Sequence, residues 1–340
     1  MAKAGKIGEF EKGILEFAKS HEFNTFWLAA ILSYPMEKDL SEEGRVKLKA
    51  EIKRGLGQKL EKKWKKKGIK AVHDEPDVLF TLNFHNGQLR VKARPLLVFG
   101  RYTKPSREIP QSKWPCRKCH GSGCDYCKGK GAMYVETVEG FLAAPLLKAS
   151  GGKSTKLHSV GREDIDARML GEGRPFIIEV GNPPKRKIDL VKIAKEANKV
   201  AAGKAGFSEL SFATEKELVE LNAAQPDKTY SLKVECASPV SDADLKKLLR
   251  LKGKTISQNT PTRVLHRRAD LLRKRKVRKV SVERTGPKSF ILTLTVQSGT
   301  YIKELVSGDK GRTKPNVSEI LGCICRPREL DVLAVGFSRE

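Results

Sequence analysis

A repeated cysteine pattern interrupts the middle of the sequence, in the stretch CRKCHGSGCDYCKGKG. Each half, 116–123 and 124–131, has the form C-x-x-C-x-G-x-G. Two such pairs can supply four thiolates to one tetrahedral ion, from Cys116, Cys119, Cys124 and Cys127. A mononuclear iron or an iron–sulfur cluster would use the same ligands, but zinc is favoured because it needs no assembly machinery. Four thiolates leave no open coordination position, so we expect a structural zinc site and chemistry elsewhere.

A second group of chemically active residues lies in GREDIDARMLGEGRPF, residues 161–176. Its two carboxylates, Asp164 and Asp166, stand among three arginines: Arg162, Arg168 and Arg174. Carboxylates held among arginines stay ionised, which suits catalysis but is also typical of a buried ion-pair network. Residue spacing by itself favours the network.

A later polar stretch, SGTYIKELVSGDKGRTKPN at 298–316, is marked by glycines and follows an apolar run. Its Lys303 and Arg312 could pair with the carboxylates of the earlier stretch. If this stretch is a strand, Tyr301 and Lys303 lie on the same side of it, because side chains alternate along a strand. Both side chains would then face one pocket.

The overall charge indicates a polyanionic partner. The 340 residues include 67 Lys and Arg against 40 Asp and Glu, a net charge of +27. Nucleic acid is favoured over an anionic membrane, because no apolar run approaches the roughly 18 residues of a spanning helix. The densest basic run predicts an RNA phosphate-binding surface: Arg263, Arg267, Arg268, Arg273, Lys274, Arg275 and Lys276. Since aromatic residues make up only 6%, shape recognition of folded RNA is favoured over an extended stacking platform.

Residues before the cysteines predict a small α/β unit. An apolar i, i+4 repeat from Leu48 to Trp64 predicts a helix over 41–67, with Asp39 and Glu42 placed as a capping box. A buried strand is expected in NTFWLAAILSY before this helix, and a hairpin around His85-Asn86-Gly87 after it.

Residues after the cysteines predict α/β structure with antiparallel pairing. Strands are expected at 173–180 and 228–237, helices at 188–202 and 214–223, and a capped helix in SDADLKKLLRL. The remaining cysteines, Cys236, Cys323 and Cys325, are expected in the core. No glycine-rich nucleotide-binding loop is visible, so we expect chemistry without an organic cofactor.

Several of these stretches resemble one enzyme family. G-R-E-D resembles the catalytic loop of pseudouridine synthases, and G-T-Y-I-K-E-L resembles their G-T-Y-I-R motif. With RYTKPSREIPQSKWPC, the cysteines, KTYSLKVE and TPTRVLHRRADLLRKR in the same order, residues 95–335 resemble the Pus10-type tRNA pseudouridine synthases of archaea and eukaryotes. The resemblance implies isomerisation of uridine 54, uridine 55 or both in the tRNA T-loop.

The resemblance also implies roles for single residues. Asp164 would be the catalytic aspartate, and Lys303 would be its basic partner. The substrate would be bound by Tyr230, Tyr301, Arg162 and Arg312. The carboxylate could act at the ribose as a nucleophile or as a base.

The implied architecture has three parts. Residues 1–104 would form a THUMP-like RNA-binding domain, and 105–135 a linker with the zinc-binding cysteines. Residues 136–340 would form the catalytic domain, an α+β fold with a mixed, largely antiparallel sheet. The start of the chain lacks the apolar segment of a secretory signal, so a cytoplasmic protein is expected, with tRNA as its partner and neither a membrane nor a protein partner evident.

Two other functions use the same residues. A non-catalytic, zinc-containing tRNA-binding or chaperone protein would share the basic surface but needs no ionised Asp164. A zinc-dependent chaperone of the DnaJ type rests on the cysteine stretch alone, because nothing else in the sequence resembles a J-domain.

Overall fold

The computed structural model describes residues 2–339, apart from the side chains of residues 2–4 and of Arg267. The chain forms two compact units. The first comprises residues 1–97 with the segments 145–156 and 179–189, and the second comprises 98–144, 157–178 and 190–340. Within the described residues, none of the helices is long and apolar enough to cross a membrane.

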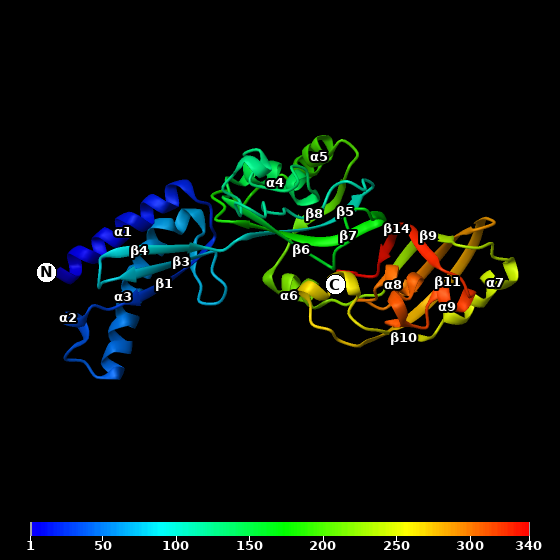
Figure 1. Cartoon of the computed structure of the whole chain (residues 1–340). Coiled ribbons are helices and arrows are strands. Elements are labelled where there is room, and N and C mark those ends of the chain that lie inside the picture. Colours follow the sequence, from blue (N-terminus) through cyan, green and yellow to red (C-terminus); the bar gives the residue numbers. More distant parts are fainter. Residues whose placement is uncertain (1, 340) are drawn as a thin grey trace. The chain divides into compact units, whose positions relative to one another are not determined.

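The first unit is built on a four-stranded sheet of order β2-β1-β3-β4 (Figure 1). β1 is parallel to β2 and β3, and β3 and β4 form the predicted antiparallel hairpin. Its elements are α1 (Ala2–Ser20), β1 (Thr25–Ile31), α2 (Tyr34–Glu37), α3 (Glu42–Trp64), β2 (Lys70–Ala71), β3 (Val78–Asn83) and β4 (Gln88–Ala93).

Helix α3 follows the predicted period, and Ile52, Leu56, Leu60 and Trp64 are buried. The predicted capping box of Asp39 and Glu42 is wrong. The N-cap is Ser41, whose side chain accepts a hydrogen bond of 3.2 Å from the backbone of Gly44. Helix α1, which the sequence patterns did not predict, contributes buried side chains to the same core.

The second unit contains most of a ten-stranded sheet of order β13-β10-β11-β12-β9-β14-β7-β5-β8, with β6 paired to β7. β14 and β7 are parallel, whereas the pairs β11–β12, β12–β9, β14–β9 and β5–β8 are antiparallel. The expected mixed sheet is therefore confirmed. The strands are β5 (Leu96–Lys104), β6 (Ser154–Ser159), β7 (Arg168–Gly181), β8 (Gly206–Phe212), β9 (Lys228–Cys236), β10 (Thr255–Gln258), β11 (Arg273–Gly286), β12 (Ser289–Val296), β13 (Thr313–Lys314) and β14 (Cys325–Val335).

The helices after the cysteines are α4 (Val138–Ser150), α5 (Leu190–Ala201), α6 (Glu215–Ala223), α7 (Asp242–Lys247), α8 (Ile302–Ser307) and α9 (Val317–Leu321). The three predicted helices correspond to α5, α6 and α7. α7 begins with a capping box between Ser241 and Asp244.

The condition that Tyr301 and Lys303 lie in a strand is not met, because Tyr301 is the N-cap of helix α8. Strand β12 ends before Gly299, which has a φ of +79° that disfavours continued extension. Ile302, Leu305 and Val306 then repeat with the helical period and are buried in the core with β9 and β12. This packing fixes the start of α8, where Tyr301 and Lys303 are located.

Candidate active site

A buried ion pair between Glu163 and Arg174 anchors the loop 161–166. Glu163 and Arg174 are almost fully buried, and Arg174 Nε donates to Glu163 Oε2 at 2.9 Å. Tyr102 OH donates to the same carboxylate at 3.0 Å. Burial raises the pKa of Tyr102 well above its usual value, so its proton stays available for this bond. Arg174 therefore pairs with Glu163 and not with Asp164 or Asp166.

The backbone of the loop is fixed by three long side chains. Lys104 Nζ donates to the carbonyl of Ile165 at 2.8 Å, and Arg107 donates to that of Asp166 at 2.8 Å. Gln111 Nε2 lies 3.2 Å from the carbonyl of Gly161. With its backbone held and Glu163 turned inward, the loop presents Asp164 outward, its side chain 47% exposed.

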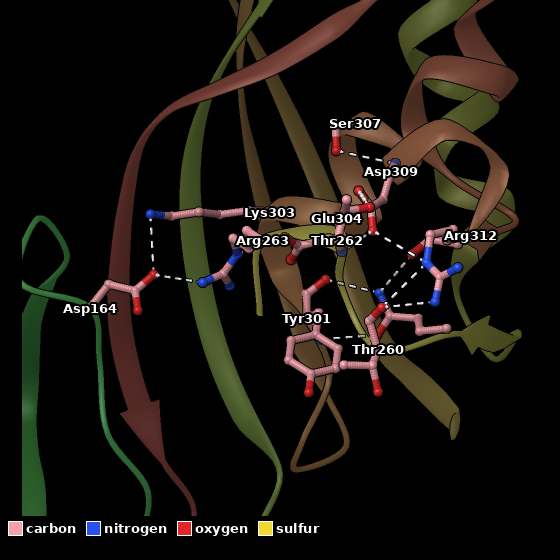
Figure 2. A network of polar contacts seen from close by, with 12 residues as sticks. Asp164, Thr260, Thr262, Arg263, Tyr301, Lys303, Glu304, Ser307, Asp309 and Arg312 are labelled. Carbon is pink, nitrogen blue, oxygen red and sulfur yellow. Dashed lines mark hydrogen bonds and ion pairs between the residues drawn. The ribbon is translucent and has the colours of Figure 1, made fainter. Parts of the chain in front are cut away.

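Two cations face Asp164, and both come from distant parts of the sequence (Figure 2). Lys303 Nζ lies 3.2 Å from Asp164 Oδ2 and also 3.0 Å from Asp166 Oδ2. The nearest guanidinium nitrogen of Arg263 lies 3.9 Å from Asp164 Oδ2. The pairing of Lys303 with the earlier stretch thus appears in the structure as the sequence suggested.

Arg263 is itself held by a buried carboxylate. Its Nε donates to Glu304 Oε1 at 2.8 Å, and the Glu304 side chain is only 8% exposed. The neighbouring positions Lys303 and Glu304 therefore both act on the surroundings of Asp164, one directly and one through Arg263. The sequence predicts Arg263 on the RNA surface, whereas its contacts in the structure place it beside the carboxylate of Asp164.

Tyr301 is fixed through its backbone and surrounded by arginines. Gln258 accepts from its N–H at 2.9 Å and donates to its carbonyl at 2.9 Å. Arg273 lies 5.8 Å from the ring centroid, and Arg268 donates to the hydroxyl at 3.3 Å. Figure 2 shows the ring pointing away from the contact between Lys303 and Asp164.

The other predicted substrate residues have different partners. Arg312 donates to Asp270 at 2.5 Å and to the carbonyl of Thr260 at 3.1 Å, so the expected pairing with the earlier stretch is wrong. Tyr230 lies in β9, where burial raises its pKa. Arg162 lies over the ring of Trp114, 5.9 Å from its centroid.

Arg168 belongs to a separate ion pair, with its Nε 2.9 Å from Asp331 Oδ1. Arg168 and Arg174 therefore pair with carboxylates other than Asp164. The cationic neighbours of Asp164 come from the start of α8 and from the segment before β11.

The basic run around β11 divides into two kinds of residue. Lys274 and Lys276 are exposed, whereas Arg273 and Arg275 alternate with them and are half-buried. Arg273 donates to Thr260 Oγ1 at 2.8 Å. The side chain of Arg267 lies outside the described residues.

The four clustered cysteines fit a tetrahedral metal. Their Sγ atoms all lie within 4.8 Å of one another, and three of the S···S distances are 3.8 Å. Sulfurs about 2.3 Å from a tetrahedral zinc lie roughly 3.8 Å apart. Gly123 and Gly131 donate backbone N–H groups to Cys119 and Cys127 at 3.2 Å each. A backbone hydrogen bond from Gly121, with smaller contributions, lowers the pKa of Cys119 to about 6, which favours the thiolate.

The remaining cysteines lie in the second unit's core as predicted. Cys236 and Cys325 are buried among its apolar side chains, and Cys323 packs against them. Their Sγ atoms also lie within 4.8 Å of one another, a spacing that could hold a metal ion.

Comparison with known proteins assigns the family. Residues 97–336 match the family model described as Pus10, C-terminal. The chain belongs to the Pus10 family. The tRNA pseudouridine synthase Pus10 of Archaeoglobus fulgidus is 34% identical to this Pus10 chain over 339 residues, covering 97% of it and 92% of the relative.

Other relatives are longer than this Pus10 chain. The tRNA pseudouridine synthase Pus10 of Methanocaldococcus jannaschii is 46% identical over 261 residues, 76% of this chain but only 57% of the relative. Among solved structures, a chain from the crystal structure of a Cbf5–Nop10–Gar1 complex aligns with 16% identity over 70% of this chain and 49% of its own. Its TM-score of 0.38 is too low to carry an argument.

Proposed function

We propose that this Pus10 chain is a tRNA pseudouridine synthase that isomerises uridine 54, uridine 55 or both in the T-loop, with Asp164 as its catalytic aspartate. The observation that carries the proposal is the arrangement of Asp164. Its carboxylate is exposed at the tip of a loop whose backbone is fixed, and Lys303 and Arg263 face it at 3.2 and 3.9 Å. A structural ion-pair network would instead bury this carboxylate, as the structure does with Glu163.

The reaction needs a carboxylate and no energy source. The N1–C1′ bond of uridine breaks, the uracil turns, and C5 bonds to C1′; C5 then loses its proton and N1 gains one. Asp164 would act at the ribose as a nucleophile or a base, and Lys303 and Arg263 would stabilise its negative charge. The target base must leave its stack to reach this carboxylate.

The other residues would bind the substrate. Tyr230 would contact the flipped uracil, while Tyr301 and the arginines around it would hold adjacent parts of the RNA. Arg162 and Arg312 are assigned to the same substrate surface, and the exposed Lys274 and Lys276 to phosphates. These assignments rest on the family's motifs and on the positions described above.

The rest of the chain would support this activity. Residues 1–104 would be a THUMP-like RNA-binding domain, 105–135 would hold a structural zinc, and 136–340 would carry the catalytic site. The enzyme would work in the cytoplasm on tRNA.

A tritium-release assay tests the proposal. A tRNA transcript labelled with tritium at C5 of uridine loses label to water when C5 forms its new bond. The wild-type protein should release tritium, and sequencing of the product should place pseudouridine at position 54 or 55. Asp164→Asn should release none while still binding the transcript. Tight binding without release by the wild type would identify the non-catalytic tRNA-binding protein instead.

A further inference from the structure

A cavity of about 360 Å³ lies beside the catalytic loop, on the side that faces the cysteine stretch. Its lining includes Gln111, Trp114, Tyr134, Arg162 and Asp164. Among the described residues, neither Lys303 nor Tyr230 lines it. The cavity therefore shares only the loop with the proposed uridine site.

The aromatic wall of this cavity is built by the two ends of the cysteine stretch. The rings of Trp114 and Tyr134 meet edge to face, with centroids 5.5 Å apart and an angle of 88°. Trp114 lies two residues before the stretch and Tyr134 three residues after it. Their segments are joined by a β-bridge between Pro115 and Ala132 and by the bond from Met133 N–H to the Trp114 carbonyl at 2.9 Å.

The cysteines fix this aromatic pair. The N–H of Cys116 donates to the carbonyl of Gly131 at 2.8 Å, so the first and last parts of the stretch are tied together next to the bridge. A metal bound by the four thiolates would lock the same ends. The sequence predicts only a structural role for these cysteines. In the structure, the stretch that contains them also positions Trp114 and Tyr134 in the cavity beside Asp164.

The chemistry of the cavity suits a nucleobase. Trp114 and Tyr134 line the cavity and are only half-buried, so part of each side chain is exposed. The Arg162 guanidinium lies 5.9 Å from the Trp114 centroid and is exposed, which adds a positive charge for a phosphate or for stacking. An aromatic ring combined with an arginine is how proteins hold unstacked bases of single-stranded RNA.

We propose that this cavity binds a nucleobase of the RNA substrate adjacent to the target uridine, by stacking on Trp114. The proposal rests on the proposed function, because the base is placed by the RNA whose uridine reaches Asp164. Once the target leaves the helical stack, its neighbour loses a stacking partner, and Trp114 replaces that partner. One such site is compatible with the low aromatic content, which disfavours only an extended platform.

A double-mutant cycle tests the proposal. Every protein carries Asp164→Asn, so that binding is measured without turnover. The RNAs are the intact tRNA transcript and a set of transcripts that each carry one abasic nucleotide in the T-loop. Trp114→Ala should weaken binding of the intact transcript about 5- to 100-fold, as expected for the loss of one stacked base. On the transcript whose abasic position is the stacked neighbour, the same substitution should cause no further loss.

Other outcomes overturn the proposal. Equal weakening on every transcript, or no weakening on any, means that Trp114 stacks on no base. Coupling only to an abasic target position means that the cavity is the uridine pocket itself. Failure of the proposed function is seen separately, as absence of tritium release by the wild type.

Two controls separate stacking from folding. Trp114→Phe keeps an aromatic ring and should retain most of the affinity, with unchanged metal content and melting temperature. Stacking should also quench the fluorescence of Trp114, measured as the difference between the wild type and Trp114→Phe on addition of the transcript. If Trp114→Ala unfolds the protein, the fluorescence difference between the wild type and Trp114→Phe tests the proposal instead. Absence of quenching of Trp114 by the transcript would refute it.

Discussion

A single ammonium group bridges the two carboxylates of the loop 161–166: Lys303 Nζ lies 3.2 Å from Asp164 Oδ2 and 3.0 Å from Asp166 Oδ2. Both carboxylates are substantially exposed, with side chains 47% and 68% accessible. Water screens such pairs, so they contribute little to folding stability. Lys303 therefore acts mainly on the orientation and charge of Asp164.

The two bridged carboxylates should differ in importance. Asp164→Asn keeps the shape of the side chain and removes its charge, so pseudouridine formation should fall below detection while tRNA affinity stays close to the wild-type value. Asp166→Asn is the matched control and should retain most of the rate. Single-turnover assays and filter binding measure both quantities. If Asp164→Asn still forms pseudouridine and Asp166→Asn does not, Asp166 is the catalytic aspartate and Asp164 is not.

Glu304 should act on catalysis only through Arg263. Glu304→Gln loosens the guanidinium beside Asp164 and should lower the single-turnover rate about 10-fold, with little change in tRNA affinity. Adding Glu304→Gln to Arg263→Met should cause no further loss of rate, because the intermediary is already absent. If the two substitutions lower the rate independently, so that their effects multiply in the double variant, Glu304 does not act through Arg263.

The same substitutions at Arg263 and Glu304 should also change the folding stability. Arg263→Met leaves the buried Glu304 unpaired and should lower the melting temperature. Glu304→Gln in that background removes the unpaired charge, so part of the lost stability should return.

The exposed lysines of β11 should carry phosphate contacts that the half-buried arginines do not. Log affinity for tRNA should fall linearly with log salt, by roughly 0.7–0.9 for each phosphate contacted. Lys274→Ala with Lys276→Ala should flatten this slope and leave the rate at saturating tRNA unchanged. Arg273→Ala with Arg275→Ala should change the slope less and reduce the rate, because Arg273 lies against the Tyr301 ring. If both variants keep the wild-type slope, neither pair contacts phosphate.

The cysteine stretch should hold one zinc per chain. Cys116→Ser with Cys119→Ser should remove that zinc and lower the melting temperature, while the folded fraction keeps its rate at saturating tRNA. Metal analysis and thermal melting measure these effects. Cys323→Ser is a suitable control, because it alters the other cysteine cluster and should leave the zinc content unchanged. A folded, tRNA-binding double variant without activity would place the metal in the catalytic site.

Lys228 should make stability depend on pH. Burial, followed by repulsion from Arg174, lowers its pKa to about 8. In the unfolded chain a lysine stays protonated up to about 10.4, so between these values the unfolded state binds more protons and stability rises with pH. Each unit of pKa difference corresponds to about 1.4 kcal/mol.

Lys228→Met should abolish this dependence of folding stability on pH. Urea unfolding at pH 7.5 and 9.5 should show the wild type gaining stability relative to the variant at the higher pH. If the difference in unfolding free energy between the wild type and the variant is the same at both pH values, Lys228 titrates normally in the folded state.

Features that depend on local patterns could be predicted from the amino-acid sequence. The period of α3, the hairpin before β5, the capped start of α7 and the cysteine spacing could all be predicted, because each is set by neighbouring residues. The pairing of Lys303 with the G-R-E-D stretch was suggested by the motifs. Glu163 and Glu304 stand within the same motifs, but nothing local distinguishes a buried anchor from an exposed charge.

Which charged side chains form ion pairs with one another depends on the tertiary fold. Arg162, Arg168 and Arg174 are close to Asp164 in sequence, yet the first lies on Trp114 and the other two pair with Asp331 and Glu163. Lys303 reaches Asp164 because the apolar side of α8 packs on the sheet and turns the start of the helix toward the loop. Ion pairs act over a few ångströms in space, and the packing of distant segments, which no local pattern contains, sets those distances.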